Sequence, residues 1–187
     1  MTTRELIVAT GAYLVALVAV AYFTSATALR VAGALAGGGV IGLAAIGVTA
    51  LAQATGWWRV PGFFSPDKLA IYYFGWAVSM APTYLITWRT ARRFGRRGLA
   101  IFLAAVAVVG PVRDYQIAAH FPEWIAFGPG VAPVLAVAVT YLGVVALGHA
   151  VMRLVAGPAA ADPLARHPHG AAGRRPPGSN GPRLYQH

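Results

Sequence analysis

The residues best suited to chemistry in this chain lie between Gly110 and Gly130, in the sequence GPVRDYQIAAHFPEWIAFGPG. The stretch holds four ionisable side chains, those of Arg113, Asp114, His120 and Glu123. Charges within a membrane span are costly and usually serve a function, so these residues are the first candidates for a site. In the functional interpretation, Arg113 binds an anionic headgroup or carboxylate, and Asp114 or His120 accepts a proton. Tyr115 then orients the ligand.

A structural interpretation explains the same residues without a ligand. Arg113 extends its guanidinium to the membrane surface and pairs with Asp114 or with Glu123 of the following segment. Pro122 and Glu123 then favour the start of a helix, since both residue types suit its first turn. On a helix Arg113 and His120 share a face, whereas Asp114 is displaced by about 100°. The sequence supports both interpretations.

The composition predicts that these residues belong to an all-α integral membrane protein. The chain has 187 residues, of which 58% are hydrophobic and 11% are charged, whereas soluble domains carry roughly 25% charged residues. Several apolar runs approach the ~20 residues that a helix needs to cross a bilayer. They do not alternate apolar and polar residues as barrel strands do. The lipid bilayer is therefore the first partner that we expect.

We predict a bundle of about five transmembrane helices and a tail. The spans fall at about residues 6–23, 31–55, 69–88, 98–119 and 131–155. The fourth span must continue through Pro111 to be long enough, which places Arg113 and Asp114 inside the membrane. The segment near 120–130 is expected to be short and interfacial or re-entrant. Residues 158–187 are basic and rich in proline and glycine, so we expect a disordered cytoplasmic tail.

The distribution of arginine predicts the orientation. Five arginines crowd into the segment 89–97 and indicate a cytoplasmic loop. With five spans, the amino terminus lies outside and the carboxyl terminus inside. This topology puts eleven Lys and Arg residues inside and four outside. Cleavage of the first span as a signal peptide after Ala28 would expose the arginine loop, so we expect no cleavage. We predict a multi-pass protein of the cell inner (plasma) membrane.

Two spans have faces with a packing or binding signature. The second carries the pairs Gly33/Gly37 and Gly38/Gly42, which let helices approach closely, within the chain or in a dimer. Internal packing is the favoured alternative. In the third span, one face gathers Tyr73, Trp76, Met80 and Thr83. This face suits a flat hydrophobic ligand such as a quinone or carotenoid, but aromatic packing between helices explains it as well.

The loop at 56–68 carries aromatic residues that suit the membrane surface: Trp57, Trp58, Phe63 and Phe64. We expect it to anchor the chain at the headgroups, with a lid over a substrate as the less favoured alternative.

Several kinds of chemistry find no support. The chain has no cysteine, which excludes thiolate nucleophiles and thiolate metal sites. It has no HExxH motif, and we predict no metal site. Its one lysine, Lys68, lies in a loop, so a retinal Schiff base within a span is not expected. His120 and His149 fall in opposite leaflets and cannot ligate one haem together. The cofactor is unknown.

Three functional hypotheses follow. The leading one is a non-catalytic binding or accessory subunit, which packs against a second copy or a membrane partner, or holds a lipid or another hydrophobic molecule. The alternative is a membrane enzyme that acts on a lipid or isoprenoid at the outer face through Arg113, Asp114 and His120. A weaker alternative is a proton-coupled carrier that uses Asp114. The charge of +10 is spread between spans, so nucleic-acid binding is not expected.

Overall fold

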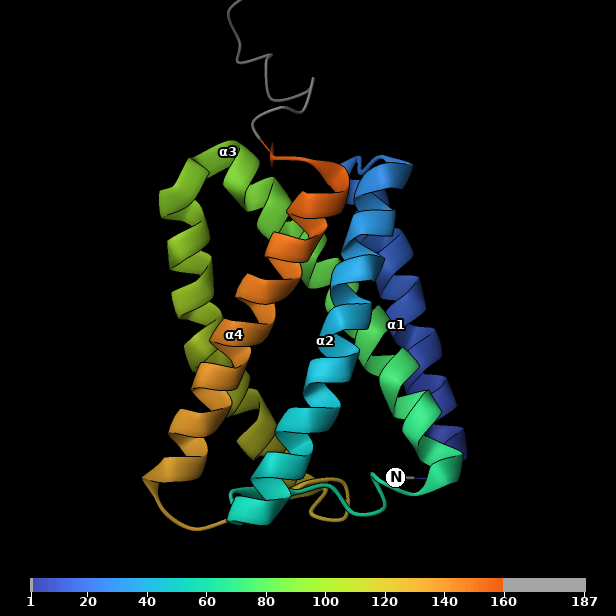
Figure 1. Ribbon diagram of the computed structural model, residues 1–187, viewed down its shortest axis with the longest axis vertical. Helices are drawn as coiled ribbons and strands as arrows, with labels where there is room; N and C mark the ends of the chain where they lie inside the picture. Colours follow the sequence, from blue (N-terminus) through green and yellow to red (C-terminus); the bar gives the residue numbers. More distant parts are fainter. Residues whose placement is uncertain (1, 160–187) are drawn as a thin grey trace, which may run out of the picture.

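The computed structural model describes residues 2–159, apart from the side chain of Asp67, as a helical bundle (Figure 1). The elements in order are α1 (Thr3–Thr24), α2 (Ala28–Thr55), β1 (Trp58–Arg59), α3 (Pro66–His120), β2 (Ala126–Phe127) and α4 (Val131–Ala156). All four helices are long and apolar enough to cross a membrane. The chain is therefore a helical membrane protein. The prediction for the tail falls mainly on residues 160–187, which lie outside the described part.

Three helices begin and end within three residues of the predicted spans, since α1, α2 and α4 differ from them by no more than that. Local capping explains the sharp turn between the first two. The side chain of Thr27 accepts a hydrogen bond from the backbone N–H of Arg30 at 3.3 Å, which satisfies a donor at the start of α2. Large apolar residues cover the outer surface of α1; Val8, Val15 and Phe23 are 65%, 70% and 75% exposed, as suits contact with lipid.

α3 corrects the prediction of a loop over residues 89–97. Helical backbone continues through the arginines and breaks only at Gly95, where φ is 64° and ψ is −154°. Arginine is a good helix former, and glycine reaches positive φ without a steric cost. In Figure 1 the chain rises along the first part of α3, turns at the end of the bundle and descends along the second part. We call this end the arginine end.

The glycines of α2 pack inside the chain, as the favoured alternative predicted. Gly33 and Gly37 face α4, and Gly38 and Gly42 face α3. A β-carbon at position 37 would lie 2.6 Å from the carbonyl oxygen of Gly148. One at position 38 would collide with the carbonyl oxygen of Ala77. These glycines let α2 approach two backbones, which leaves this face of α2 covered within one chain.

The largest of three core clusters among the described residues lies toward the arginine end. Its largest side chains are at most 1% exposed: Ile41, Tyr84, Leu85, Trp88 and Met152. The hydroxyl of Tyr84 donates to the carbonyl oxygen of Val144 at 3.3 Å. The guanidinium carbons of Arg30 and Arg92 lie 5.1 and 4.7 Å from the centroid of the Trp88 ring. Cation–π contacts therefore extend this core to the arginines.

At the opposite end, two loops form what we call the loop cap, residues 56–65 and 121–130. β1 and β2 pair antiparallel and join the two loops, with Trp58 opposite Phe127. The backbone N–H of Gly128 donates to the carbonyl oxygen of Trp57 at 2.8 Å. A turn occupies residues 122–124, so no helix starts at Pro122. The segment near 120–130 is thus a turn and a strand, and α4 begins at Val131.

Candidate functional site

A cavity of about 570 Å³ lies beneath the loop cap, between α1, α3 and α4. This volume falls in the range of small-molecule sites, roughly 300–1,000 Å³. Most of its wall is apolar and includes Leu6, Ile71, Trp76, Ile117 and Val137. The loop cap contributes Trp58, Val60, Phe63, Trp124 and Ile125. The cap therefore forms one wall of the cavity.

Polar groups gather at one place on this wall, which we call the polar corner: Arg113, Asp114 and Tyr141. The Arg113 Nε and Nη2 atoms lie 3.1 and 3.0 Å from Asp114 Oδ1. The Tyr141 hydroxyl lies 3.0 Å from both carboxylate oxygens of Asp114. The Arg113 side chain is 54% exposed, whereas that of Asp114 is only 18% exposed. The corner thus holds a shielded carboxylate beside a more accessible cation.

Gly110 positions Tyr141. A β-carbon at position 110 would lie 2.5 Å from Cδ2 of the Tyr141 ring. Because glycine has no side chain, the ring passes over the α3 backbone one turn before Asp114. The tyrosine hydroxyl from α4 then reaches the carboxylate on α3. A charged group within a span is stabilised by this kind of partner from a neighbouring helix.

Other polar side chains on the wall are mostly occupied by local bonds. The Thr10 hydroxyl donates to the Leu6 carbonyl at 2.8 Å, and the Ser79 hydroxyl donates to the Trp76 carbonyl at 3.1 Å. Tyr72 differs. It is 6% exposed, and its hydroxyl oxygen is buried without a hydrogen-bond partner among the described residues. The wall therefore contains a buried phenol with unused hydrogen-bonding capacity, which is costly to bury.

The structure brings together some of the predicted site residues. Arg113, Asp114 and Trp76 all line the cavity, as do Met80 and Thr83 from the predicted aromatic face. Tyr73, the remaining member of that face, does not. Its ring lies against α2, where a β-carbon at Gly42 would be 2.9 Å from the tyrosine Cδ2. Tyr73 fills a packing role between helices.

Tyr115, His120 and Glu123 lie apart from the cavity wall. The Tyr115 ring stacks on Phe127 of the loop cap, with centroids 4.2 Å apart and planes 9° apart. His120 is exposed, and its Nδ1 lies 2.8 Å from the carbonyl oxygen of Gln116. Glu123 is exposed in the turn of the cap. The structure therefore does not place His120 or Glu123 beside Asp114.

Two aromatic residues of the 56–68 loop correct the prediction of a surface anchor. Trp58 and Phe63 are 8% and 2% exposed. Phe63 packs on Tyr72, with ring centroids 4.7 Å apart. Phe64 alone among the large apolar residues here is markedly exposed, at 44%. These two rings therefore pack inside the protein, against Tyr72 and Phe127.

Sequence reasoning missed Tyr72 and Tyr141 as site residues. Each stands in an apolar span and carries a group that hydrogen-bonds when buried. A tyrosine hydroxyl in an apolar span is the only sequence signal for these two site residues. Tyr73 and Tyr84 carry the same signal without lining the cavity, so it does not identify a site.

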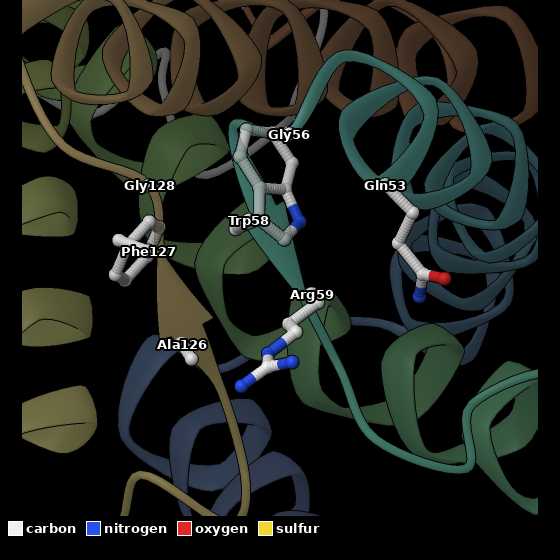
Figure 2. Close-up of a pocket in the computed structure, with 7 residues that line it drawn as sticks. All are labelled: Gln53, Gly56, Trp58, Arg59, Ala126, Phe127 and Gly128. Carbon is white, nitrogen blue, oxygen red and sulfur yellow. The ribbon is translucent and has the colours of Figure 1, made fainter.

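A smaller hollow of about 290 Å³ lies at the paired strands, at the end of α2. Figure 2 shows the side chains of Gln53 and Arg59 beside Trp58 and Phe127. Gln53 and Arg59 are exposed, and much of the remaining wall comes from Gly56, Ala126 and Gly128. This hollow lacks the interacting polar groups of the larger cavity.

His149 serves the core at the arginine end. It is 5% exposed, and its Nδ1 lies 2.9 Å from the Thr87 hydroxyl oxygen. Thr87 donates its one proton to the Tyr84 carbonyl at 2.8 Å, so its oxygen accepts from His149 Nδ1–H. Within residues 2–159, no group of three or more His, Asp or Glu side chains is placed to hold a metal ion.

Comparisons with protein-family models, with curated proteins and with solved structures find no match to this chain.

Proposed function

We propose that this chain is a non-catalytic membrane protein that holds a hydrophobic molecule in the cavity beneath the loop cap. One observation carries the proposal: a cavity of about 570 Å³ with apolar walls has one polar corner. Small-molecule sites share this composition, since apolar walls supply contact area and a few polar groups fix orientation. Of the predicted partners, a lipid or hydrophobic ligand fits this arrangement. A dimer through the glycines of α2 does not, because α3 and α4 already cover them.

Binding is favoured over catalysis by the state of the candidate groups. An enzyme built on Arg113, Asp114 and His120 needs the imidazole near the reacting atoms. His120 instead faces the Gln116 carbonyl, away from the cavity. Both Arg113 and Tyr141 donate to Asp114, so its carboxylate is already engaged by two neighbours. The arrangement holds charge in place and supports binding of a ligand.

The packing at the arginine end weighs against a carrier. Transport requires a path from Asp114 to the other side of the membrane. On that side Tyr84, Leu85 and Trp88 are at most 1% exposed. Ile41 and Met152 fill the same core from α2 and α4. This core supports a cavity that is closed toward the arginine end.

We also propose that the chain crosses the inner (plasma) membrane five times, with its amino terminus outside. The two parts of α3, separated at Gly95, then count as two crossings. In Figure 1 the turn of α3 and the end of α4 lie at one end, and the start of α1 and the loop cap lie at the other. Arg30 and Arg153 join residues 89–97 at the arginine end, which suits the cytoplasmic side.

The absence of cysteine makes this topology directly measurable. Glu123→Cys in the cap and Arg96→Cys at the arginine end are treated in intact cells with a membrane-impermeant maleimide. Labelling of the cap variant alone is expected. Labelling of the arginine-end variant alone, or of both, would contradict the proposed orientation.

Binding is tested by extraction. The protein is purified in mild detergent, and molecules that accompany it are extracted into organic solvent and identified by mass spectrometry. We expect one hydrophobic compound, enriched over bulk lipid, from the natural chain. Thr140→Phe places a ring in the cavity wall and should remove that compound. Val139→Phe adds the same ring to the adjacent position, which is 66% exposed, and should retain it. A natural chain that carries only bulk lipid would overturn the proposal.

A further inference from the structure

We infer that the ligand of the cavity is an uncharged lipid alcohol whose hydroxyl group binds at the polar corner. The inference rests on the proposed function and names the chemical class of its ligand. It follows from the charge of the corner and from a count of its hydrogen-bonding capacity. The unpartnered hydroxyl of Tyr72 on the same wall provides a second, independent observation.

The charge of the corner disfavours an ionic head group. Arg113 and Asp114 lie 3.0 Å apart and neutralise each other. A phosphate that approached Arg113 would also approach the carboxylate of Asp114, which repels it. An ammonium group that approached Asp114 would also approach the guanidinium of Arg113, which repels it. Because the cavity is otherwise lined mainly by apolar groups, the cost of desolvating an ionic head group would not be offset. A neutral head group avoids this cost.

The hydrogen-bond count selects a group that both donates and accepts. The Tyr141 hydroxyl has one proton, which it shares between Asp114 Oδ1 and Oδ2. Oδ1 also accepts from Nε and Nη2 of Arg113. Oδ2 is therefore the less occupied oxygen and can accept another hydrogen bond. The Arg113 guanidinium has five N–H groups, of which two are used in these bonds, so it can still donate.

A hydroxyl group matches both capacities. It donates to Asp114 Oδ2 and accepts from Arg113, while remaining uncharged. A ketone or quinone carbonyl only accepts, so it would leave the carboxylate without a new donor. A hydrocarbon can neither donate to Asp114 nor accept from Arg113. The Tyr72 hydroxyl, which is buried and unpartnered within residues 2–159, shows that the same wall can hydrogen-bond an uncharged oxygen. The hydrocarbon chain of the ligand then packs against the cavity wall at Trp76 and Ile117.

The test compares four probes with one hydrocarbon skeleton: farnesol, farnesyl methyl ether, farnesyl phosphate and the alkane farnesane. Each is titrated into the full chain in phosphatidylcholine nanodiscs. Binding is followed by tryptophan emission, because Trp76 and Trp124 line the cavity. Farnesol is expected to bind tightest. The ether, which lacks the donor, should bind about tenfold more weakly, as befits a lost hydrogen bond to a charged group. Farnesyl phosphate should also bind more weakly than farnesol.

Asp114→Asn provides the decisive variant. Its amide removes the negative charge and leaves Arg113 as a cation, so the order of farnesol and farnesyl phosphate should invert. Glu123→Gln is the matched control, because it removes one carboxylate from an exposed position in the loop cap, outside the cavity. The control should keep the order of the natural chain. The probe series on the natural chain tests the inference even where Asp114→Asn does not fold.

The outcomes separate the two proposals. Equal saturable binding of all four probes would retain the hydrophobic-ligand function and overturn the alcohol class. Tightest binding of farnesyl phosphate to the natural chain would overturn it as well. No saturable binding of any probe would overturn both the class and the proposed function. Thr140→Phe should abolish binding of every probe, and persistence of binding there would place the ligand outside the cavity.

Discussion

At the arginine end the helices converge on large side chains that are at most 1% exposed, including Tyr84, Leu85 and Trp88. At the cap end they separate around a cavity of about 570 Å³. Both ends are built from the same apolar residue types. Composition therefore does not explain the difference, whereas the positions of glycine explain the close packing at the arginine end.

Glycine sets the separation of the helices along α2. The contacts of Gly37 and Gly38 with backbone atoms of α4 and α3 lie in the half of α2 nearer the arginine end. The next glycine, Gly47, has no atom within 4 Å of its would-be β-carbon. Beyond Gly42 the packed face of α2 continues with Ala45, Thr49 and Ala52, which are at most 2% exposed. Close approach at Gly37 and Gly38 therefore packs the arginine end, whereas the cavity lies between α1, α3 and α4 and receives only Val48 from α2.

The largest effect expected from this comparison concerns two tryptophans. Trp88→Ala should lower the free energy of unfolding by about 3–5 kcal/mol, since it removes a fully buried ring from a packed core. Trp76→Ala should cost clearly less, because the Trp76 ring already borders a cavity. Reversible unfolding in mixed micelles measures both. Equal losses would show that the two ends are packed alike.

An intermediate effect is expected at two glycines of α2. Gly38→Ala should destabilise the fold by about 1–3 kcal/mol, the usual cost of overpacking, because the added methyl group meets the backbone carbonyl of Ala77. Gly47→Ala is the matched control. It adds the same methyl group to open space and should be neutral or stabilising by up to about 1 kcal/mol. Thermal unfolding in detergent compares them, and similar behaviour of the two variants would refute the role given to glycine.

The smallest effect is expected at the polar corner. Tyr141→Phe removes the bond to Asp114 and should cost about 0.6–1.7 kcal/mol, the range for hydrogen bonds within membrane proteins. Tyr115→Phe removes a hydroxyl that has no partner among the described residues and should cost nothing. Unfolding free energies of the two variants provide the measurement. A greater loss from Tyr115→Phe would contradict the hydrogen-bond assignment at the corner.

Hydropathy predicts where α1, α2 and α4 lie, but it does not predict the backbone structure of the arginine segment within α3. α1, α2 and α4 follow the apolar runs, because a helix in lipid must be apolar along its length. The arginine segment was predicted as a loop because charge ends a span, but charge does not end a helix. The helix continues through the first arginines to Gly95, and the positive φ of Gly95 produces the turn.

The site was predicted in part for a related reason. Arg113 and Asp114 stand out in an apolar span because a charged side chain there has a high free-energy cost. Tyr141 does not, because an apolar helix in lipid lacks the polar face that would show which side its tyrosine takes. Trp58 and Phe63 suit the membrane surface and the protein interior equally by residue type. Their burial depends on the pairing of two distant loops, which neither residue encodes locally.

That pairing has a consequence for the order of assembly. β1 and β2 belong to loops separated in the chain by the whole of α3, so Trp58 can meet Phe127 only after both parts of α3 are in place. During synthesis the site therefore stays unroofed until late, when the last helix follows β2 by three residues. For the ligand that we propose, entry before this pairing forms meets one wall fewer than entry afterwards.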